Sequence, residues 1–308
     1  MTSLPPPLIR RNLKKLSAHI VVALIALVVV GGATRVMEAG LACPDWPLCY
    51  GSFFPKGQMN IQVFLEWFHR LDAFFVGVAI FFQFIFTLIY RSYLPKYFLW
   101  FSGLIFSLIL IQGLLGALTV FQLLPSAIVS THLTMGLALI ALMSGFTQRI
   151  SFASETPSPF WWQYSTISCL LAVIGQCLIG SLMATSWASQ RCLNQLDSCF
   201  FLDLHAKTAI PITLMLLAFV FTSLYIGGWF RRQWPFLLAV LLLVFMQIGL
   251  GILSVRFSLN EASLIVGHQL VAALLVALLA ALSFRRPTQK LAKFNKSFEN
   301  KNLEVCHG

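Results

Sequence analysis

The hydrophobic positions of this chain fall into eight long runs that are separated by short polar segments. Each run contains about 20 or more mainly apolar residues, which is the length that an α-helix needs to cross the hydrocarbon core of a bilayer. The pattern therefore predicts eight transmembrane helices. The runs cover residues 17–36, 63–90, 97–120, 126–148, 161–185, 203–226, 234–254 and 263–284.

The composition agrees with this pattern. Of the 308 residues, 58% are hydrophobic and only 10% are charged, which lies outside the usual composition of soluble domains. The formal net charge of +11 could indicate a nucleic-acid partner, but the basic residues flank the apolar runs and form no continuous patch. We therefore predict an all-α integral membrane protein that lies in a lipid bilayer, and we expect no nucleic-acid partner.

The basic residues also indicate how the chain is oriented. Both terminal segments and every second connection are rich in Lys and Arg, whereas the other connections contain only four basic residues. By the positive-inside rule, both termini are expected on the cytoplasmic side. No convincing small-x-small cleavage site follows the first run, so we expect it to remain as a span and not to be removed as a signal peptide.

The two halves of the chain repeat one another. Gly31 and Cys43 have counterparts 149 positions later, and the Gln-Gly-Leu-Leu-Gly segment 112–116 has a counterpart 135 positions later. Four helices return the chain to its starting side, so the copies are parallel, and we predict two pseudo-symmetric four-helix bundles. The expected domains are a cytoplasmic N-terminal tail (1–16), a first bundle (17–150), a cytoplasmic linker (151–160), a second bundle (161–284) and a cytoplasmic C-terminal tail (285–308).

Four histidines lie five or six residues inside the same predicted end of the membrane, about 9 Å deep at the rise of an α-helix. They are His69 and His132 in the first half, and His205 and His268 in the second. Zinc normally needs three or four ligands at one centre, which two histidines per bundle do not supply. Two imidazoles on facing helices suit the axial positions of a haem iron. The glycines of 112–116 and 247–251 could make room for the macrocycle or allow close helix packing.

The first histidine of each half has different neighbours. Glu66 precedes His69 by three residues, so on a helix both side chains share one face and can point at the same ligand. The corresponding position before His205 is Leu202, although Asp203 lies close by. Ionisable groups are expensive in lipid, which makes this asymmetry a functional signal.

Two cysteine pairs lie in the predicted outer loops. They are Cys43 and Cys49 in the first loop, and Cys192 and Cys199 in the second. A disulfide is expected in each pair, because the outer side of the membrane is oxidising. The sequence leaves open whether each pair is a structural staple or a redox-active dithiol.

These motifs resemble those of the haem A synthase family, membrane enzymes that convert haem O to haem A for cytochrome oxidase. The resemblance covers all eight predicted helices. It rests on Gly-Gly-Ala-Thr-Arg at 31–35, Cys-Pro-Asp-Trp-Pro-Leu-Cys at 43–49, Glu-Trp-Phe-His-Arg at 66–70 and the histidines at 132, 205 and 268. It implies that His205 and His268 hold haem b in the second half. It also implies that haem O, the substrate, binds between His69 and His132.

The family's reaction oxidises one ring methyl of haem O to a formyl group through a hydroxymethyl intermediate. The resemblance implies that Glu66, His69 and His132 are the catalytic residues, because a reacting site needs a group that handles protons. Arg70 and Lys207 could contact haem propionates or extend to the lipid headgroups. Haem O synthase and the assembly of cytochrome oxidase are the implied partners, the electron donor is unidentified, and the implied location is a bacterial inner (plasma) membrane.

Two other functions fit part of the sequence. A di-haem electron-transfer membrane cytochrome would use all four histidines without any substrate chemistry. A disulfide-handling membrane oxidoreductase would use the two loop cysteine pairs, but it leaves Glu66 and the repeated histidines without a role.

Overall fold

The computed structural model describes residues 7–151, 159–185 and 200–286, and this part of the chain is almost entirely helical. Eight of its helices are long and apolar enough to cross a membrane, which confirms the predicted fold class. Three short helical turns, η1 (Lys56–Gln58), η2 (Arg91–Tyr93) and α8 (Gly228–Arg231), lie in the connections. The long helices are α1 (Pro7–Val36), α2 (Ile61–Ile89), α3 (Lys96–Phe121), α4 (Ser126–Ser151), α5 (Phe160–Thr185), α7 (Phe200–Ile226), α9 (Trp234–Arg256) and α10 (Ala262–Ser283).

Seven of the long helices begin and end within three residues of the predicted runs, but α1 begins ten residues earlier than expected. Its first turns are basic, and Lys and Arg are good helix formers. Leu13 is fully buried there, and Arg10 donates a hydrogen bond to the carbonyl of Ile150 on α4 at 2.7 Å. The run of apolar residues therefore marked the part of α1 that is suited to lipid, not the whole helix.

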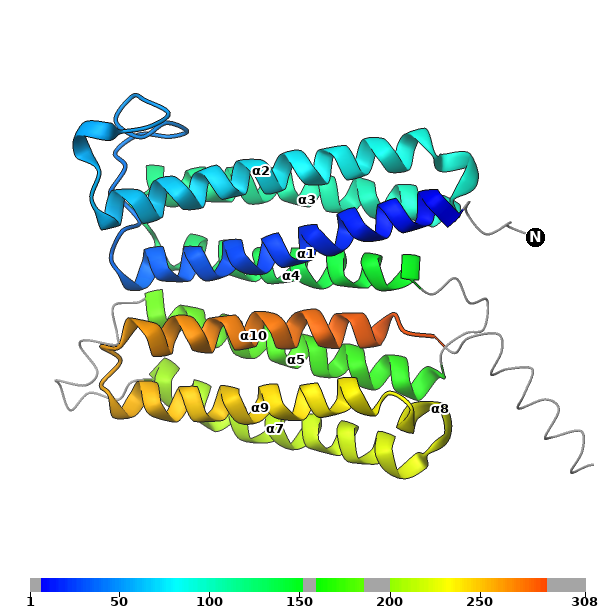
Figure 1. Ribbon diagram of the computed structural model, residues 1–308. Helices are drawn as coiled ribbons and strands as arrows, with labels where there is room; N and C mark the ends of the chain where they lie inside the picture. Colours follow the sequence, from blue (N-terminus) through cyan, green and yellow to red (C-terminus); the bar gives the residue numbers. More distant parts are fainter. Residues whose placement is uncertain (1–6, 152–158, 186–199, 287–308) are drawn as a thin grey trace, which may run out of the picture.

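Each half of the chain forms a closed ring of four helices. In the first half, α1 contacts α2 and α4, and α3 contacts the same two helices. In the second half, α5 contacts α7 and α10, and α9 contacts the same two helices. Figure 1 shows the two rings lying side by side with their helices roughly parallel. The order of contacts is the same in both halves, whereas the pseudo-symmetry of the bundles and the domain boundaries stay predictions.

The two rings meet through α1, α4, α5 and α10. Ser144 on α4 donates to the carbonyl of Ala277 on α10 at 2.7 Å, and Ser181 on α5 donates to the hydroxyl of Ser130 on α4 at 3.0 Å. Polar groups inside a membrane protein need such partners, because no water is present to satisfy them. This contact region between the two rings, which we call the seam, is therefore a specific interface. One continuous apolar core runs through both rings.

Large apolar side chains also cover the outside of the molecule. Among those that are more than half exposed are Phe82, Leu110, Leu171, Leu214 and Phe245, each from a different long helix. Contiguous apolar surface of this kind is rare on soluble monomers, but it suits the hydrocarbon of a bilayer. The chain is therefore a multi-pass membrane protein.

The two ends of the helical assembly differ. The histidine end is where α1, α3, α5 and α9 finish, and the basic end is where α1 begins and α10 finishes. At the histidine end, residues 37–60 form a long connection between α1 and α2, which we call the cap loop. Figure 1 shows the cap loop projecting beyond the ends of the helices.

Candidate functional site

The four predicted histidines all lie near the histidine end. Each belongs to a helix that starts there, namely α2, α4, α7 or α10, and each is within the first nine residues of that helix. His205 and His268 come together directly: their ring centroids are 6.3 Å apart. Two imidazoles bound to opposite faces of one metal ion, with metal–nitrogen distances of about 2 Å, would have centroids about 6 Å apart. The spacing in the second half therefore fits a bis-histidine haem.

Each imidazole packs against a glycine of the preceding long helix. A methyl group added to Gly31 would lie 2.8 Å from Cε1 of His69, and one added to Gly180 would lie 2.9 Å from Cε1 of His205. Cβ atoms essentially never come closer than 3.0 Å to a neighbour, so a larger residue at either position would force the imidazole to move. The other two contacts repeat the arrangement at slightly longer distances. They are Gly116 with His132 at 3.2 Å and Gly251 with His268 at 3.3 Å.

Two further glycines face open space. A methyl group on Gly113 or Gly249 would meet no atom within 4 Å. The sequence left open whether the glycines of these segments serve packing or leave room for a macrocycle. In the structure Gly116 and Gly251 pack on imidazoles, whereas room for a macrocycle beside Gly113 and Gly249 stays a prediction.

Three glutamines contact the histidines, two through the backbone carbonyl and one through the ring. Gln112 donates to the carbonyl of His132 at 2.9 Å, and Gln176 donates to the carbonyl of His205 at 2.6 Å. Gln247 instead lies 3.0 Å from Nε2 of His268. The sequence analysis gave these residues no role. The available signal was a polar residue in an apolar helix four positions before the histidine-contacting glycine, which occurs in α3, α5 and α9.

Each of the four imidazoles has a buried Nδ1 atom without a hydrogen-bond partner in the described structure. Buried polar side-chain atoms usually have a partner, so the same exception at all four histidines is a feature shared by the two halves, and which ring nitrogen would bind a ligand stays a prediction. The described residues contain no group of three or more His, Cys, Asp or Glu that could hold a metal ion. This donor set fits a haem with two axial histidines better than it fits tetrahedral zinc.

Glu66 lies beneath the cap loop and is only 3% exposed. One carboxylate oxygen accepts a hydrogen bond from the backbone N–H of Cys43 at 2.7 Å, and the other forms an ion pair with Arg70. The prediction considered only the helix face that Glu66 shares with His69. The structure adds that both oxygens of Glu66 contact groups that hold the cap loop.

Arg70 is the main anchor of that loop. Its guanidinium donates to the carbonyls of Asp45 at 2.5 Å and Leu48 at 2.6 Å, in addition to its contact with Glu66. Lys207, which follows His205 by two residues in the second half, pairs with Asp203 at 2.7 Å, and its side chain is 73% exposed. The two basic residues therefore have different surroundings, and their contact with propionates stays a prediction.

The cap loop has a small core of its own. The predicted disulfide between Cys43 and Cys49 is present, and both residues are buried against Val63. Asp45 accepts hydrogen bonds from the N–H groups of Gly51 and Tyr50, each at 2.7 Å, and these bonds hold the pKa of its carboxyl below the ordinary value. The second predicted pair, Cys192 and Cys199, lies outside the described residues.

Comparisons with known proteins agree with this geometry. The chain matches the family COX15-CtaA, described as a cytochrome oxidase assembly protein, over residues 14–280. A protein named heme A synthase from Shewanella oneidensis is 28% identical to this chain, over 84% of this chain and 92% of that protein. Heme A synthases from Bradyrhizobium diazoefficiens and Bacillus pumilus are 29% and 33% identical over 53% and 42% of this chain, and over 55% and 42% of their own lengths. The chain belongs to the COX15-CtaA family of cytochrome oxidase assembly proteins.

Proposed function

We propose that this protein is a haem A synthase, which oxidises a methyl group of haem O to a formyl group through a hydroxymethyl intermediate. The product, haem A, would serve the assembly of cytochrome oxidase. The observation that carries this proposal is the asymmetry between two otherwise similar histidine pairs. Both pairs pack on glycines in the same way, but only the first has a buried glutamate one helical turn away, because Leu202 stands at the corresponding place in the second.

The second half, residues 161–284, would hold haem b through His205 and His268. When bound, haem b would supply a one-electron redox centre beside the reacting half. Gly180 and Gly251 place the two imidazoles, and Gln176 fixes the turn of α7 that carries His205. These residues bind and orient, and none of them has to transfer a proton. This half therefore needs no counterpart of Glu66.

The first half, residues 17–150, would bind haem O as substrate between His69 and His132. Conversion of the methyl group to a formyl group replaces two hydrogens of that carbon with one oxygen atom and removes four electrons, so it needs an oxygen source and an oxidant, both unidentified, and it releases protons to a nearby group. Glu66 is the buried carboxylate closest in the chain to His69. An ionised carboxylate has about four lone-pair sites, and the contacts with Cys43 and Arg70 leave some of them for a proton or for a polar intermediate.

The membrane location and partners follow from the same reasoning. We expect a bacterial inner membrane with both termini in the cytoplasm, because the two terminal segments and every second connection together carry most of the Lys and Arg residues. The site between His69 and His132 would then lie near the outer surface of the membrane, beneath the cap loop. Haem O synthase is the expected source of the substrate, and the electron donor is unidentified.

The test compares the Glu66→Ala variant with a variant that loosens the cap loop but keeps the carboxylate. Both are expressed with a source of haem O, and the extracted pigments are separated by chromatography. General acid–base groups contribute about a hundredfold or more to a rate. Glu66→Ala should therefore retain haem b but lose haem A by about that factor, or accumulate the hydroxymethyl intermediate.

The matched control is Cys43→Ser with Cys49→Ser, which removes the disulfide of the cap loop. It should still make haem A at a level well above that of Glu66→Ala. Equal loss in both variants would mean that Glu66 acts only by holding the loop. Full haem A yield from Glu66→Ala would contradict the role of Glu66, whereas absence of haem A from the wild-type protein would favour the di-haem electron-transfer cytochrome.

A further inference from the structure

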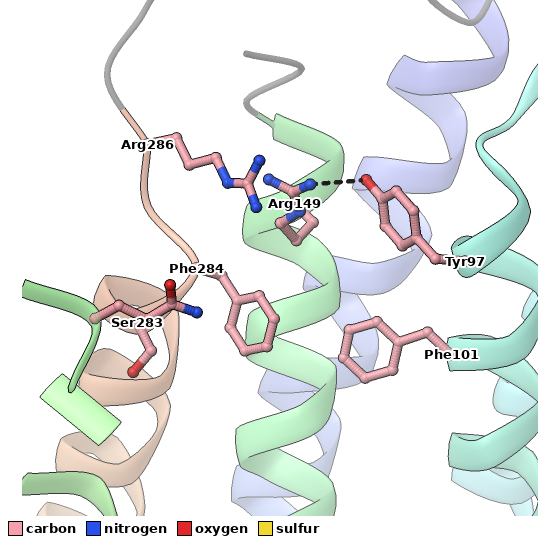
Figure 2. Close-up of a pocket in the computed structure, with 7 residues that line it drawn as sticks. Tyr97, Phe101, Arg149, Ser283, Phe284 and Arg286 are labelled. Carbon is pink, nitrogen blue, oxygen red and sulfur yellow. Dashed lines mark hydrogen bonds between the residues drawn. The ribbon is translucent and has the colours of Figure 1, made fainter. Parts of the chain in front are cut away.

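A cavity of about 300 Å³ lies at the basic end, far along the helices from the histidines. It opens at the seam between the two halves, because its lining comes from α3, α4, α5 and the end of α10. Figure 2 shows the guanidinium groups of Arg149 and Arg286 turned toward one another at its rim. The described residues that line it are Tyr97, Phe101, Arg149, Gln163, Ser283, Phe284 and Arg286.

The rim of the cavity carries two positive charges and no acidic side chain among the lining residues that the structure describes. Arg149 donates to the hydroxyl of Tyr97 at 3.2 Å through one nitrogen, while its Nη1 atom is buried without a partner. Burial and the nearby charge of Arg149 also lower the pKa of Arg286. The guanidinium groups of Arg149 and Arg286 carry like charges and face one another, and Arg149 has an unused donor. This arrangement favours an anion between them.

The floor of the cavity is aromatic. The rings of Phe101 and Phe284 stack with their centroids 6.0 Å apart, below the two arginines. Phe284 is held in place by the surface of α4 at Gly145, where an added methyl group would lie only 2.6 Å from the ring. An anion-binding rim above an apolar floor matches an amphiphile better than a free inorganic ion, because a free ion gains nothing from the floor.

The position of the cavity in the membrane points the same way. The long helices begin or finish at this end, so the rim lies at the level where lipid headgroups meet the hydrocarbon core. Basic cavities between transmembrane helices are a recurrent binding site for anionic lipid headgroups. We propose that Arg149 and Arg286 together bind the phosphate of an anionic phospholipid, whose glycerol and upper acyl chains rest on Phe101 and Phe284.

This lipid would join the two halves of the protein. Arg149 belongs to α4 of the first ring, whereas Arg286 follows α10 of the second ring. A phosphate shared by both guanidiniums replaces a repulsion across the seam with two charge-assisted contacts. The bound lipid should therefore stabilise the assembled pair of rings, independently of any haem chemistry.

The experiment measures lipid binding to the purified full-length protein by native mass spectrometry and by thermal unfolding. Phosphatidylglycerol is the anionic probe, phosphatidylcholine is the zwitterionic control, and inorganic phosphate tests a free anion. Phosphatidylglycerol should bind and raise the unfolding temperature, and the other two should do neither. An equal effect of inorganic phosphate would overturn the assignment to a lipid, and an equal effect of phosphatidylcholine would overturn the role of charge.

Variants then assign the site. A basic residue near a headgroup contributes roughly a factor of five to binding, so Arg286→Gln should weaken phosphatidylglycerol about fivefold and the double variant with Arg149→Gln about thirtyfold. Arg91→Gln is the matched control, because Arg91 is exposed at the same end and does not line the cavity. Equal weakening by Arg91→Gln, or unchanged binding by Arg286→Gln, would overturn the proposal. Arg286 follows the end of α10, so its replacement leaves the bundle intact even if the double variant does not fold.

Discussion

Replacing Gly180 with alanine tests whether the glycine contact determines the position of a haem ligand. The new methyl group would lie 2.9 Å from Cε1 of His205, whereas ordinary contacts begin at 3.4 Å. The imidazole would therefore have to withdraw by about 0.5 Å, which exceeds the tolerance of about 0.2 Å for metal–ligand distances. Overpacking of this kind costs roughly 1–3 kcal/mol, so haem b should be held about five to a hundred times more weakly.

Gly175→Ala is the control for this experiment. Gly175 lies on the same helix, and a methyl group there would meet nothing within 4 Å. Both variants gain the same intrinsic helix stability, about 1 kcal/mol, so a difference between them reports the contact with His205. The measurements are haem b per protein after purification and the rate of haem transfer to apomyoglobin. Wild-type retention by Gly180→Ala, or equal loss by Gly175→Ala, would refute the reasoning.

Two other predictions concern the assignment of the halves and the cap loop. His205→Ala should remove the low-spin haem b absorption spectrum of the purified protein, while His69→Ala should largely spare it; the reverse result would exchange the roles of the two halves. Because the pKa of Asp45 is lowered in the folded loop, its stabilisation is complete above the ordinary value of about 3.9 and is lost as the pH falls through the lowered value. Amide hydrogen exchange at Gly51 should therefore speed up, beyond its intrinsic pH dependence, only in that acidic range, and Asp45→Asn should speed it up already at neutral pH.

The sequence predicted the features of this protein that depend on local pattern. Eight helices followed from the length of the apolar runs, and the matched histidines followed from the repeat. The predicted start of α1 was wrong, because a helix can continue beyond the part of it that contacts lipid. The disulfide of the cap loop was predicted correctly, since two cysteines six residues apart in an oxidised loop have few other partners.

The parts that sequence reasoning missed are contacts between helices or between a helix and a loop. Nothing local shows that Gly31 lies against His69, because the two residues are 38 positions apart. The anchoring of the cap loop was missed for the same reason. Arg70 was expected to contact a propionate or the lipid headgroups. Its hydrogen bonds to the carbonyls of Asp45 and Leu48 join residues that are distant in the sequence and meet only in the folded protein.

Two neighbouring glycines on α1 serve both halves of the protein at once. Gly31 makes room for the ring of His69, while Gly32 faces the amide of Gln269, which directly follows His268 and donates to the carbonyl of Val28 at 2.8 Å. Substitutions at this pair are therefore subject to selection from both halves together. If the protein arose by duplication of a four-helix ancestor, this stretch of α1 now links the evolution of the two copies, because a substitution at Gly31 or Gly32 would disturb contacts in both halves.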